Sequence, residues 1–103
     1  CWSADEATAR KHVHRLWAHQ AVPGEANQVL PSPAHFEQIA SVVTEEMAVG
    51  TVGAVGNRVE DFVAAVREYV DAGYDEVYVA NMGPHYEEMI RAYGEKVLPA
   101  LRG

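Results

Sequence analysis

Five histidines among 103 residues are the side chains that first suggest metal binding or acid–base chemistry. Three of them, His12, His14 and His19, fall within a single predicted helix. Helices that bind zinc place two histidines at positions i and i+4, and no pair among these three has that spacing. We therefore predict solvent-facing residues on one helix, with neither a metal site nor a catalytic residue among them.

Polar residues in the loop after this helix are a second candidate. Glu25, Asn27 and Gln28 lie between Pro23-Gly24 and Pro31, so they belong to an irregular segment. Amide side chains there could exchange hydrogen bonds with a substrate. An ordinary solvated loop explains the same composition and is slightly favoured.

Two further features lack the surroundings that chemistry would need. Cys1 has no neighbouring base in the sequence to activate its thiol, and as the lone cysteine it cannot form an internal disulfide. Gly50, Gly53 and Gly56 recur every three residues, unlike the glycines of phosphate-binding loops. This glycine segment is interpreted as a flexible connector or a short strand.

Apolar periodicity and breaker residues divide the chain into four helices and one strand. The first predicted helix begins at a Ser3–Glu6 capping box and ends near Gln20, and a loop follows to Pro31. A second helix starts at Ser32 and Pro33 and is followed by a short turn capped by Thr44. The sequence then predicts a helix over 57–72, capped by Asn57 and ended by Gly73, a strand over 74–81, and a helix over 84–98 closed by Pro99. The predicted fold class is α/β and helix-rich, with one domain at most.

The predicted strand Tyr74–Asn81 needs partners. Its β-branched and aromatic residues suit a strand that is buried on both faces, as in a parallel sheet. Each backbone N–H and C=O of a buried strand requires a hydrogen bond. Gly50–Val55 could supply one neighbour, but its glycines make a poor strand. We therefore expect pairing with an N-terminal part that is missing from these residues, or with a second copy of the chain.

Fifteen acidic residues against eight basic ones give a net charge of −7. Such a surface repels nucleic acid and anionic membranes, so neither is expected as a partner. No apolar run approaches the roughly 18 residues of a membrane span, and no signal peptide is recognisable. Since no internal disulfide can form, a cytoplasmic location is the default expectation.

Four stretches share the pattern of a known family: Cys1–Ala7, Leu30–Glu37, Val63–Val79 and Tyr93–Arg102. The helix that runs through Ala72-Gly73 into an aromatic strand is fairly specific when combined with the Leu-Pro-Ala-Leu ending. Together they resemble the luciferase-like monooxygenase superfamily, and within it the oxidoreductases that use coenzyme F420, a deazaflavin. The resemblance covers essentially the whole chain.

The resemblance implies that the chain is the C-terminal segment of a (β/α)₈ barrel about two to three times as long. On this mapping Cys1-Trp2 ends the seventh strand and Tyr74–Asn81 is the eighth. Residues 20–56 form an insertion over the catalytic mouth, and residues 84–98 are the last helix.

Barrels of this kind place their active sites at the carboxyl ends of the strands. The resemblance therefore makes Asn81, Met82 and His85 candidate substrate contacts, together with Asn27 and Gln28 of the insertion. A plain strand-to-helix turn, and a surface position for His85, are the competing interpretations.

The resemblance further implies coenzyme F420 for the parent enzyme, with flavin mononucleotide as the alternative. The phosphate-binding loops of such enzymes lie earlier in the chain, so this segment is expected to bind no cofactor alone. The sugar-phosphate branch of the family carries a Lys-His pair where this chain has Asn27-Gln28, and an Arg near Thr51. A sugar 6-phosphate is therefore not the expected substrate.

Functions from different classes remain open. The parent enzyme would transfer a hydride between the deazaflavin and a small organic substrate, and this segment would supply the last barrel unit and the substrate-covering insertion. The alternative is a stand-alone module that buries its strand and apolar helix faces by self-association. A small-ligand binder without chemistry would need a polar cluster that the sequence does not show.

Overall fold

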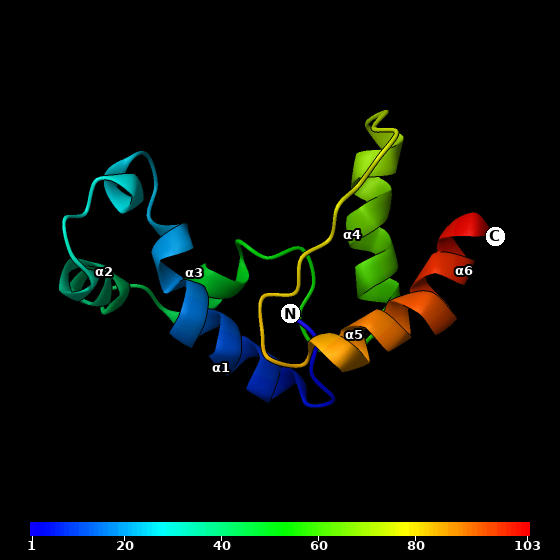
Figure 1. The fold of residues 1–103 in the computed structure, drawn as a ribbon, viewed down its shortest axis with the longest axis horizontal. Coiled ribbons are helices and arrows are strands. Elements are labelled where there is room, and N and C mark those ends of the chain that lie inside the picture. Colours follow the sequence, from blue (N-terminus) through cyan, green and yellow to red (C-terminus); the bar gives the residue numbers. More distant parts are fainter.

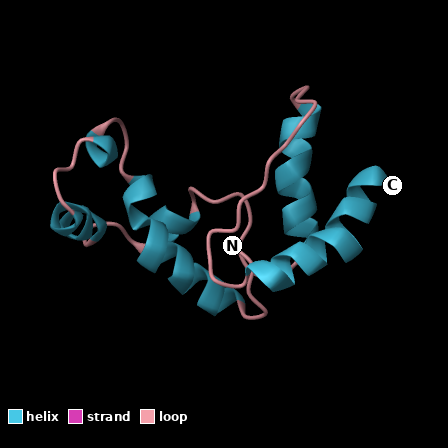
Figure 2. Cartoon of the chain, viewed as in Figure 1, coloured by secondary structure: helices cyan, strands magenta, loops and turns pink.

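The computed structural model describes all residues from 1 to 103, and it consists of helices joined by loops (Figures 1 and 2). In chain order the elements are α1 (Glu6–Trp17), the 3₁₀ turns η1 (Ala18–Ala21) and η2 (Ala26–Gln28), α2 (Pro33–Ala40), α3 (Glu45–Val49), α4 (Val59–Asp71), α5 (Tyr86–Ala92), the π-helical turn η3 (Tyr93–Val97) and α6 (Leu98–Arg102). β pairing is limited to one isolated parallel bridge between Trp2 and Gly56. The predicted helix-rich character is confirmed.

The helices form two arms that meet near the N-terminus (Figure 1). One arm holds α1, α2 and α3, and the other holds α4 and the continuous run α5–η3–α6. The molecule measures 46 × 31 × 20 Å along its principal axes. No helix combines the length and the apolar character that crossing a bilayer would require.

A small core holds α1 against α3. Ala9 and Val13 share one face of α1 because they are four residues apart, and both are fully buried. They pack with Ala48 of α3, which is also fully buried. Beside this core, Arg10 Nε and Glu45 Oε1 form an ion pair at 2.9 Å. The first arm is therefore a helix pair closed by one partly exposed ion pair.

A second group of buried apolar side chains lies in the other arm. Phe62 and Val66 are the buried residues of α4, and Met89 and Val97 are buried on the C-terminal helix. The Phe62 ring meets the Tyr93 ring edge to face, with centroids 6.0 Å apart. This arm supports the loop that carries the predicted strand.

Two of the predicted helix caps are wrong. Asp5, rather than Ser3, is the N-cap of α1, and its carboxylate accepts from the Thr8 N–H at 3.0 Å. Ser3 is buried, and its hydroxyl accepts from the Asp5 N–H. Arg58 precedes α4 because the Asn57 side chain donates instead to the main chain just before α1. The Ser3 hydroxyl is thus engaged locally, by the N–H two residues further along the chain, and the Asn57 amide is engaged by a tertiary contact with the C=O of Ala4.

Pro99 does not close the last helix, and the predicted range 84–98 is wrong at both ends. The helix begins at Tyr86, passes through Pro99 and continues to Arg102. A proline inside an α-helix lacks the N–H and crowds the preceding turn. Here the π-helical turn η3 comes first, and the Leu98 N–H bonds to the C=O of Tyr93, five residues back. This wider turn accommodates the proline ring.

The predicted strand Tyr74–Asn81 does not form a strand within this chain. Residues 75–84 take part in no backbone–backbone hydrogen bond, and Figure 2 draws them as loop. The segment is not buried either, since the Tyr78 side chain is 89% exposed. Gly50–Val55 does not pair with it. The bridge at Gly56 is made to Trp2 instead. The sequence has strand character, and the partners that would make a sheet are absent from these 103 residues.

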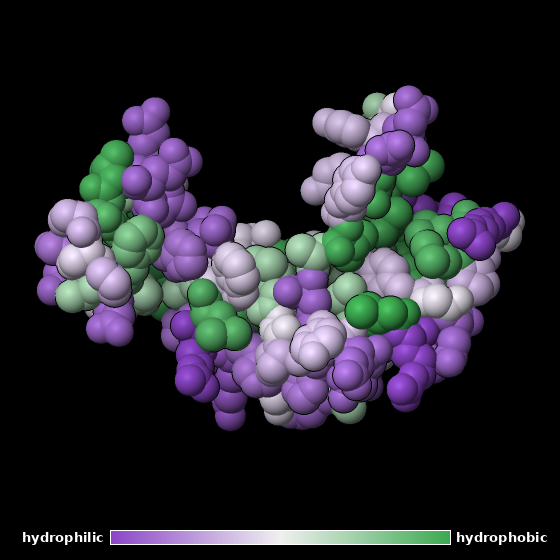
Figure 3. Space-filling model, viewed as in Figure 1, coloured by the Kyte–Doolittle hydropathy of each residue, from purple (hydrophilic) through white to green (hydrophobic).

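The chain exposes more surface than a folded protein of its mass. Its accessible surface is 7026 Å², against roughly 5,700 Å² expected for a compact 11.3 kDa monomer. Its radius of gyration is 15.0 Å, where about 13 Å is usual for this length. Only 13 of its 103 residues are buried. Figure 3 shows apolar side chains gathered on the arm that holds α4 and α6, so part of this surface is apolar and open.

Gly73 is confirmed as the stop of α4 and gives a direct stability test. Its φ of +95° lies in the left-handed region, and a Cβ there would meet no atom within 4 Å. Gly73→Ala should therefore lower the free energy of unfolding by about 1 kcal/mol through backbone strain alone. Gly94→Ala is the matched control, because Gly94 is helical and equally open. It should raise stability by roughly 0.5–1 kcal/mol. Urea unfolding followed by circular dichroism measures both, and equal effects at the two sites would contradict this assignment.

Candidate functional site

The loop that follows residue 80 is hydrogen-bonded to Trp2 near the N-terminus and to Trp17 at the end of α1. The Asn81 side chain accepts a hydrogen bond from the Trp2 N–H at 3.1 Å and donates one to the Gly83 C=O at 3.0 Å. The Trp17 indole N–H donates to the Met82 C=O at 2.8 Å. These bonds fix the loop where the predicted strand ends. We call Trp17, Asn81, Met82, His85 and the neighbouring His12 the strand-end cluster.

Two histidines face each other in this cluster. The rings of His12 and His85 are tilted by 41°, with centroids 5.6 Å apart. Nδ1 of His12 is shielded from solvent and has no hydrogen-bond partner, while Nδ1 of His85 lies 3.7 Å from a carboxylate oxygen of Glu88. A shielded imidazole nitrogen without a partner can bond to a polar group that enters beside it. The cluster therefore offers one unused polar atom.

A shallow hollow of about 270 Å³ lies next to the cluster. It is lined by Leu16, Trp17, Asn81, Met82 and Gly83. The Asn81 amide is already engaged on both its oxygen and its nitrogen. Asn81 therefore positions the loop, and the wall of the hollow is mainly the faces of Trp17 and Met82.

The structure brings together only part of the predicted site. Asn81, Met82 and His85 lie in one cluster against α1. Asn27 and Gln28 do not join them. They lie in η2, where the Asn27 amide is 3.5 Å from the C=O of His19 and Gln28 is exposed.

Two members of the cluster were missed from sequence. Neither Trp17 nor His12 was among the predicted site residues, and His12 was expected to face solvent on its helix. A clue to Trp17 was available, because an indole N–H that leaves water needs an acceptor. No comparable signal marks His12, since its neighbour His85 is 73 positions away in the chain.

The remaining histidines contact separate partners. His14 Nε2 lies 2.7 Å from the C=O of Val43, and His35 Nδ1 lies 2.6 Å from the hydroxyl of Ser32. The ring of His19 stacks on that of Trp17. The structure gathers no group of three or more His, Cys, Asp or Glu side chains that could share a metal ion.

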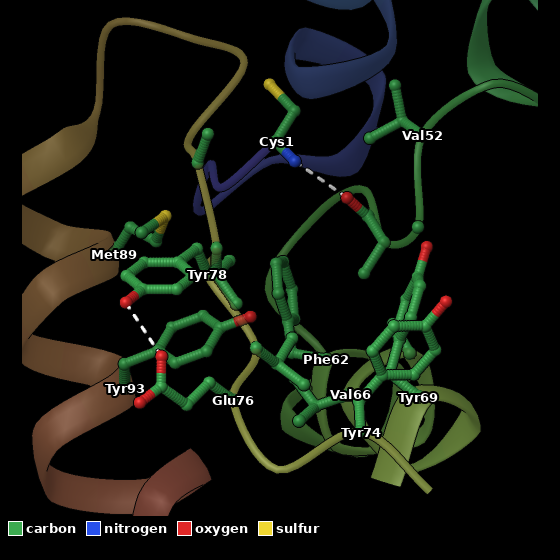
Figure 4. Close-up of a pocket in the computed structure, with 16 residues that line it drawn as sticks. Cys1, Val52, Phe62, Val66, Tyr69, Tyr74, Glu76, Tyr78, Met89 and Tyr93 are labelled. Atoms are coloured by element: carbon green, nitrogen blue, oxygen red, sulfur yellow. Dashed lines mark hydrogen bonds between the residues drawn. The ribbon is translucent and has the colours of Figure 1, made fainter. Parts of the chain in front are cut away.

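A second cavity, larger than the hollow, is a groove beside the cluster, shown in Figure 4. Its volume is about 410 Å³, and 14 of its 16 lining residues are hydrophobic. We call it the apolar groove. It runs between α4, the 74–80 segment and α5, and its wall includes Phe62, Val66 and Tyr93. Burial raises the pKa of the Tyr93 hydroxyl. Glu76 is its one charged side chain, and it bonds to the hydroxyl of Tyr78.

Cys1 closes one end of the apolar groove through backbone pairing. Its amino group donates to the Ala54 C=O at 2.7 Å, and its C=O accepts from the Gly56 N–H at 2.9 Å. The Ser3 N–H then donates to the Gly56 C=O at 3.1 Å. These three alternating bonds have the pattern of two parallel strands. Burial lowers the pKa of the Cys1 amino group to about 6.

The chain is similar to three curated proteins, each named F420-dependent glucose-6-phosphate dehydrogenase. It is 28% identical over 88 residues to the protein from Microbacterium testaceum, covering 85% of this chain and 26% of that one. It is 27% identical over 95 residues to the protein from Intrasporangium calvum, covering 92% and 28%. The Nakamurella multipartita protein is 26% identical over 88 residues. No protein-family model matches the chain. The chain thus spans about a quarter of the length of these relatives.

Replacing Asn81 tests its positioning role. Asn81→Ala removes both bonds of the amide and leaves the half-buried Trp2 N–H unpaired, which should cost about 2 kcal/mol of unfolding free energy. Asn27→Ala is the matched control, because its single bond is long, and it should change stability by less than about 0.5 kcal/mol. Chemical unfolding of the two variants gives the comparison. Similar losses of unfolding free energy in the two variants would contradict the positioning role of Asn81.

The amino group of Cys1 makes stability depend on pH. Its lowered pKa means that the unfolded chain binds more protons between pH 6 and 8, so the free energy of unfolding should rise across this range. Allowing for partial exposure, the gain is about 1 kcal/mol. The N-acetylated chain keeps the N–H donor without the charge and carries the same histidines. The difference in unfolding free energy between the two chains should therefore change with pH as the amine titrates. Parallel curves of unfolding free energy against pH would contradict the burial of the Cys1 amino group.

Proposed function

We propose that this chain is the C-terminal segment of an F420-dependent, luciferase-like oxidoreductase built on a (β/α)₈ barrel. One observation carries the proposal: 85–92% of the chain aligns with proteins named as F420-dependent dehydrogenases, of which it covers only 26–28%. The parent enzyme would transfer a hydride between the coenzyme and a small organic substrate in the cytoplasm. Residues 20–56 would form the insertion that covers the substrate.

The arrangement of the second arm supports this role. Helix α4, the Gly73 stop, an extended segment and the C-terminal helix follow one another in the order of a barrel unit. The strand-end cluster lies at the carboxyl end of that segment, where barrel enzymes bind their substrates. The open surface of the chain is the second support, because a barrel would cover it.

The chain's own contribution would be positioning and exclusion of water. Trp17 and Met82 present apolar faces to the hollow, and their mutual hydrogen bond holds them in place. A rigid apolar wall orients a substrate and keeps water from the reacting carbons. No pair of carboxylates or nucleophile with its base faces the hollow, so we assign no catalytic residue in this segment.

The residues present do not fit the cofactor itself. Both F420 and flavin mononucleotide carry phosphate, which proteins bind with cationic side chains and backbone N–H groups at helix starts. The apolar groove holds one charged side chain, the acidic Glu76, and the hollow holds none. The chain as a whole carries a charge of −7. The cofactor would therefore be held by parts of the parent enzyme outside these residues.

The same argument bears on the substrate. The relatives are named for glucose 6-phosphate, whose phosphate calls for Lys or Arg. The strand-end cluster contains neither, and the loop residues Asn27 and Gln28 are neutral. We infer that the substrate is a small organic molecule other than a sugar 6-phosphate.

A chimera tests the proposed function. In the Microbacterium testaceum enzyme, the 88 matched residues are replaced by those of this chain. The chimera should bind F420 in a fluorescence titration, since the cofactor site lies elsewhere, and it should lose glucose 6-phosphate turnover. The double substitution Asn27→Lys with Gln28→His in the chimera should restore part of the glucose 6-phosphate turnover. The 103-residue chain alone should bind no F420.

Two results would contradict the proposal. One is tight F420 binding by the isolated chain. The other is a chimera that folds, by circular dichroism and thermal melting, yet fails to bind the coenzyme.

Self-association without catalysis is the second candidate function. It is favoured by the exposure of Tyr78 and of Val79, which a second copy could cover. Light scattering decides it. A stable dimer that forms at low concentration and is abolished by Tyr78→Asp would support it, and a monomer would exclude it.

A further inference from the structure

We propose that the hollow beside the strand-end cluster binds an uncharged, planar aromatic group, which stacks on the indole ring of Trp17. The inference rests on the proposed function, because it names the chemical class of the substrate that the parent enzyme would hold there. It is carried by the contacts that fix the Trp17 ring and by the chemistry of the residues that line the hollow.

The Trp17 ring is held in one orientation before any ligand arrives. Its N–H donates to the Met82 C=O at 2.8 Å, and its ring stacks with that of His19, with centroids 6.0 Å apart and planes 29° apart. The His19 ring in turn meets the edge of Phe36 in α2, with centroids 5.7 Å apart. This aromatic row joins α1, η1 and α2. A ligand that stacks on a ring already held in place binds with a smaller loss of conformational entropy.

One face of the indole remains for the hollow. The N–H edge is occupied by Met82, and His19 stacks on the ring from outside the hollow, since it is not among the lining residues. The largest part of the half-buried Trp17 ring left to line the hollow is therefore its opposite face. Two aromatic rings stack in an offset arrangement with centroids about 4.5–7 Å apart. A fixed indole face at the wall of a hollow suits a second ring.

The rest of the wall favours an uncharged ring. None of its residues is charged, and the amide of Asn81 is engaged on both its oxygen and its nitrogen. A charged ligand would lose hydration and find no side-chain partner in this wall. Met82 also lines the hollow, and a thioether sulfur makes favourable contacts with aromatic rings. An aromatic ring thus gains contacts here that an aliphatic group of the same size cannot make.

The size of the hollow limits the ligand to a small ring system. Its volume of about 270 Å³ lies just below the range of roughly 300–1,000 Å³ that is usual for small-molecule sites. A Cβ at Gly83 would lie 2.7 Å from the Cys1 sulfur, so this part of the loop already packs directly on Cys1. The hollow cannot deepen there without displacing the N-terminus. One ring or two fused rings fit this space, and a long chain does not.

The experiment compares two probes of the same skeleton, planar 2-naphthol and its saturated, non-planar analogue decahydro-2-naphthol. Each is titrated into the nitrogen-15-labelled chain, and the indole N–H signals of Trp17 and Trp2 are followed by nuclear magnetic resonance. The planar probe should bind about tenfold more tightly, because only it can stack. It should shift the Trp17 signal, while the signal of Trp2, whose ring packs on Phe62, stays in place.

Two substitutions form a matched pair. Trp17→Phe and Trp17→Leu both remove the hydrogen bond to Met82, but only phenylalanine keeps an aromatic face. The Phe variant should retain most of the preference for 2-naphthol, and the Leu variant should bind the two probes equally. Circular dichroism checks that both variants fold. An equal preference in both variants, or probe-induced shifts at Phe62 and Tyr93 of the apolar groove in place of Trp17, would overturn the stacking site.

Titrations with F420 and with the chimera separate the possible sources of the ring. If F420 displaces 2-naphthol from the isolated chain, the ring is that of the coenzyme, and the substrate assignment is overturned. A folded chimera that binds F420 without preferring 2-naphthol would overturn the stacking site and keep the proposed function. A preference for 2-naphthol in the isolated chain, with a folded chimera that fails to bind F420, would keep the stacking site and reject the proposed function.

Discussion

A backbone N–H or C=O that leaves water must find another partner, and residues 75–84 of this chain find none in the backbone. This constraint explains most of the structure. Because the segment cannot pair, it stays at the surface as a loop, and the apolar sides of α4 and α5 that a sheet would cover line an open groove. The core between α1 and α3 is completed by local helix packing, whereas Phe62 and Val66 of the other arm line the groove.

The ends of the unpaired segment are nevertheless fixed. Gly73 turns the chain out of α4, and Asn81 ties its far end to Trp2 and Gly83. Trp17 adds a bond from α1 to Met82. A loop of this kind has few conformations left to lose when a neighbouring strand arrives, which favours pairing because less entropy is lost. The same residues of the strand-end cluster therefore fix the loop and line the hollow where the substrate is proposed to bind.

Helices were predicted well because their signals are local. The apolar spacing of Ala9 with Val13, and the left-handed Gly73, are properties of a few adjacent residues. The caps at Ser3 and Asn57 failed because each side chain bonds elsewhere: the Ser3 hydroxyl accepts from the nearby Asp5 N–H, and the Asn57 amide donates to the C=O of Ala4 in the tertiary structure. Pro99 failed as a stop because a π-helical turn, which has no simple sequence signature, precedes it.

The candidate site was predicted in part for the same reason. Asn81, Met82 and His85 follow a recognisable strand pattern, and a family resemblance placed them at its carboxyl end. Trp17 and His12 belong to the cluster only through contacts across more than sixty positions of chain, which no local pattern encodes. Strand character itself was readable, whereas strand formation depends on partners that these residues do not include.

Hydrogen exchange at Val77 and Val79 measures that dependence most directly. In the isolated chain their amides should exchange at nearly the rate of an unstructured peptide. In the chimera that embeds these residues in the Microbacterium testaceum enzyme they should be among the slowest to exchange. Fast exchange in a folded, F420-binding chimera would contradict the claim that this segment becomes a paired strand.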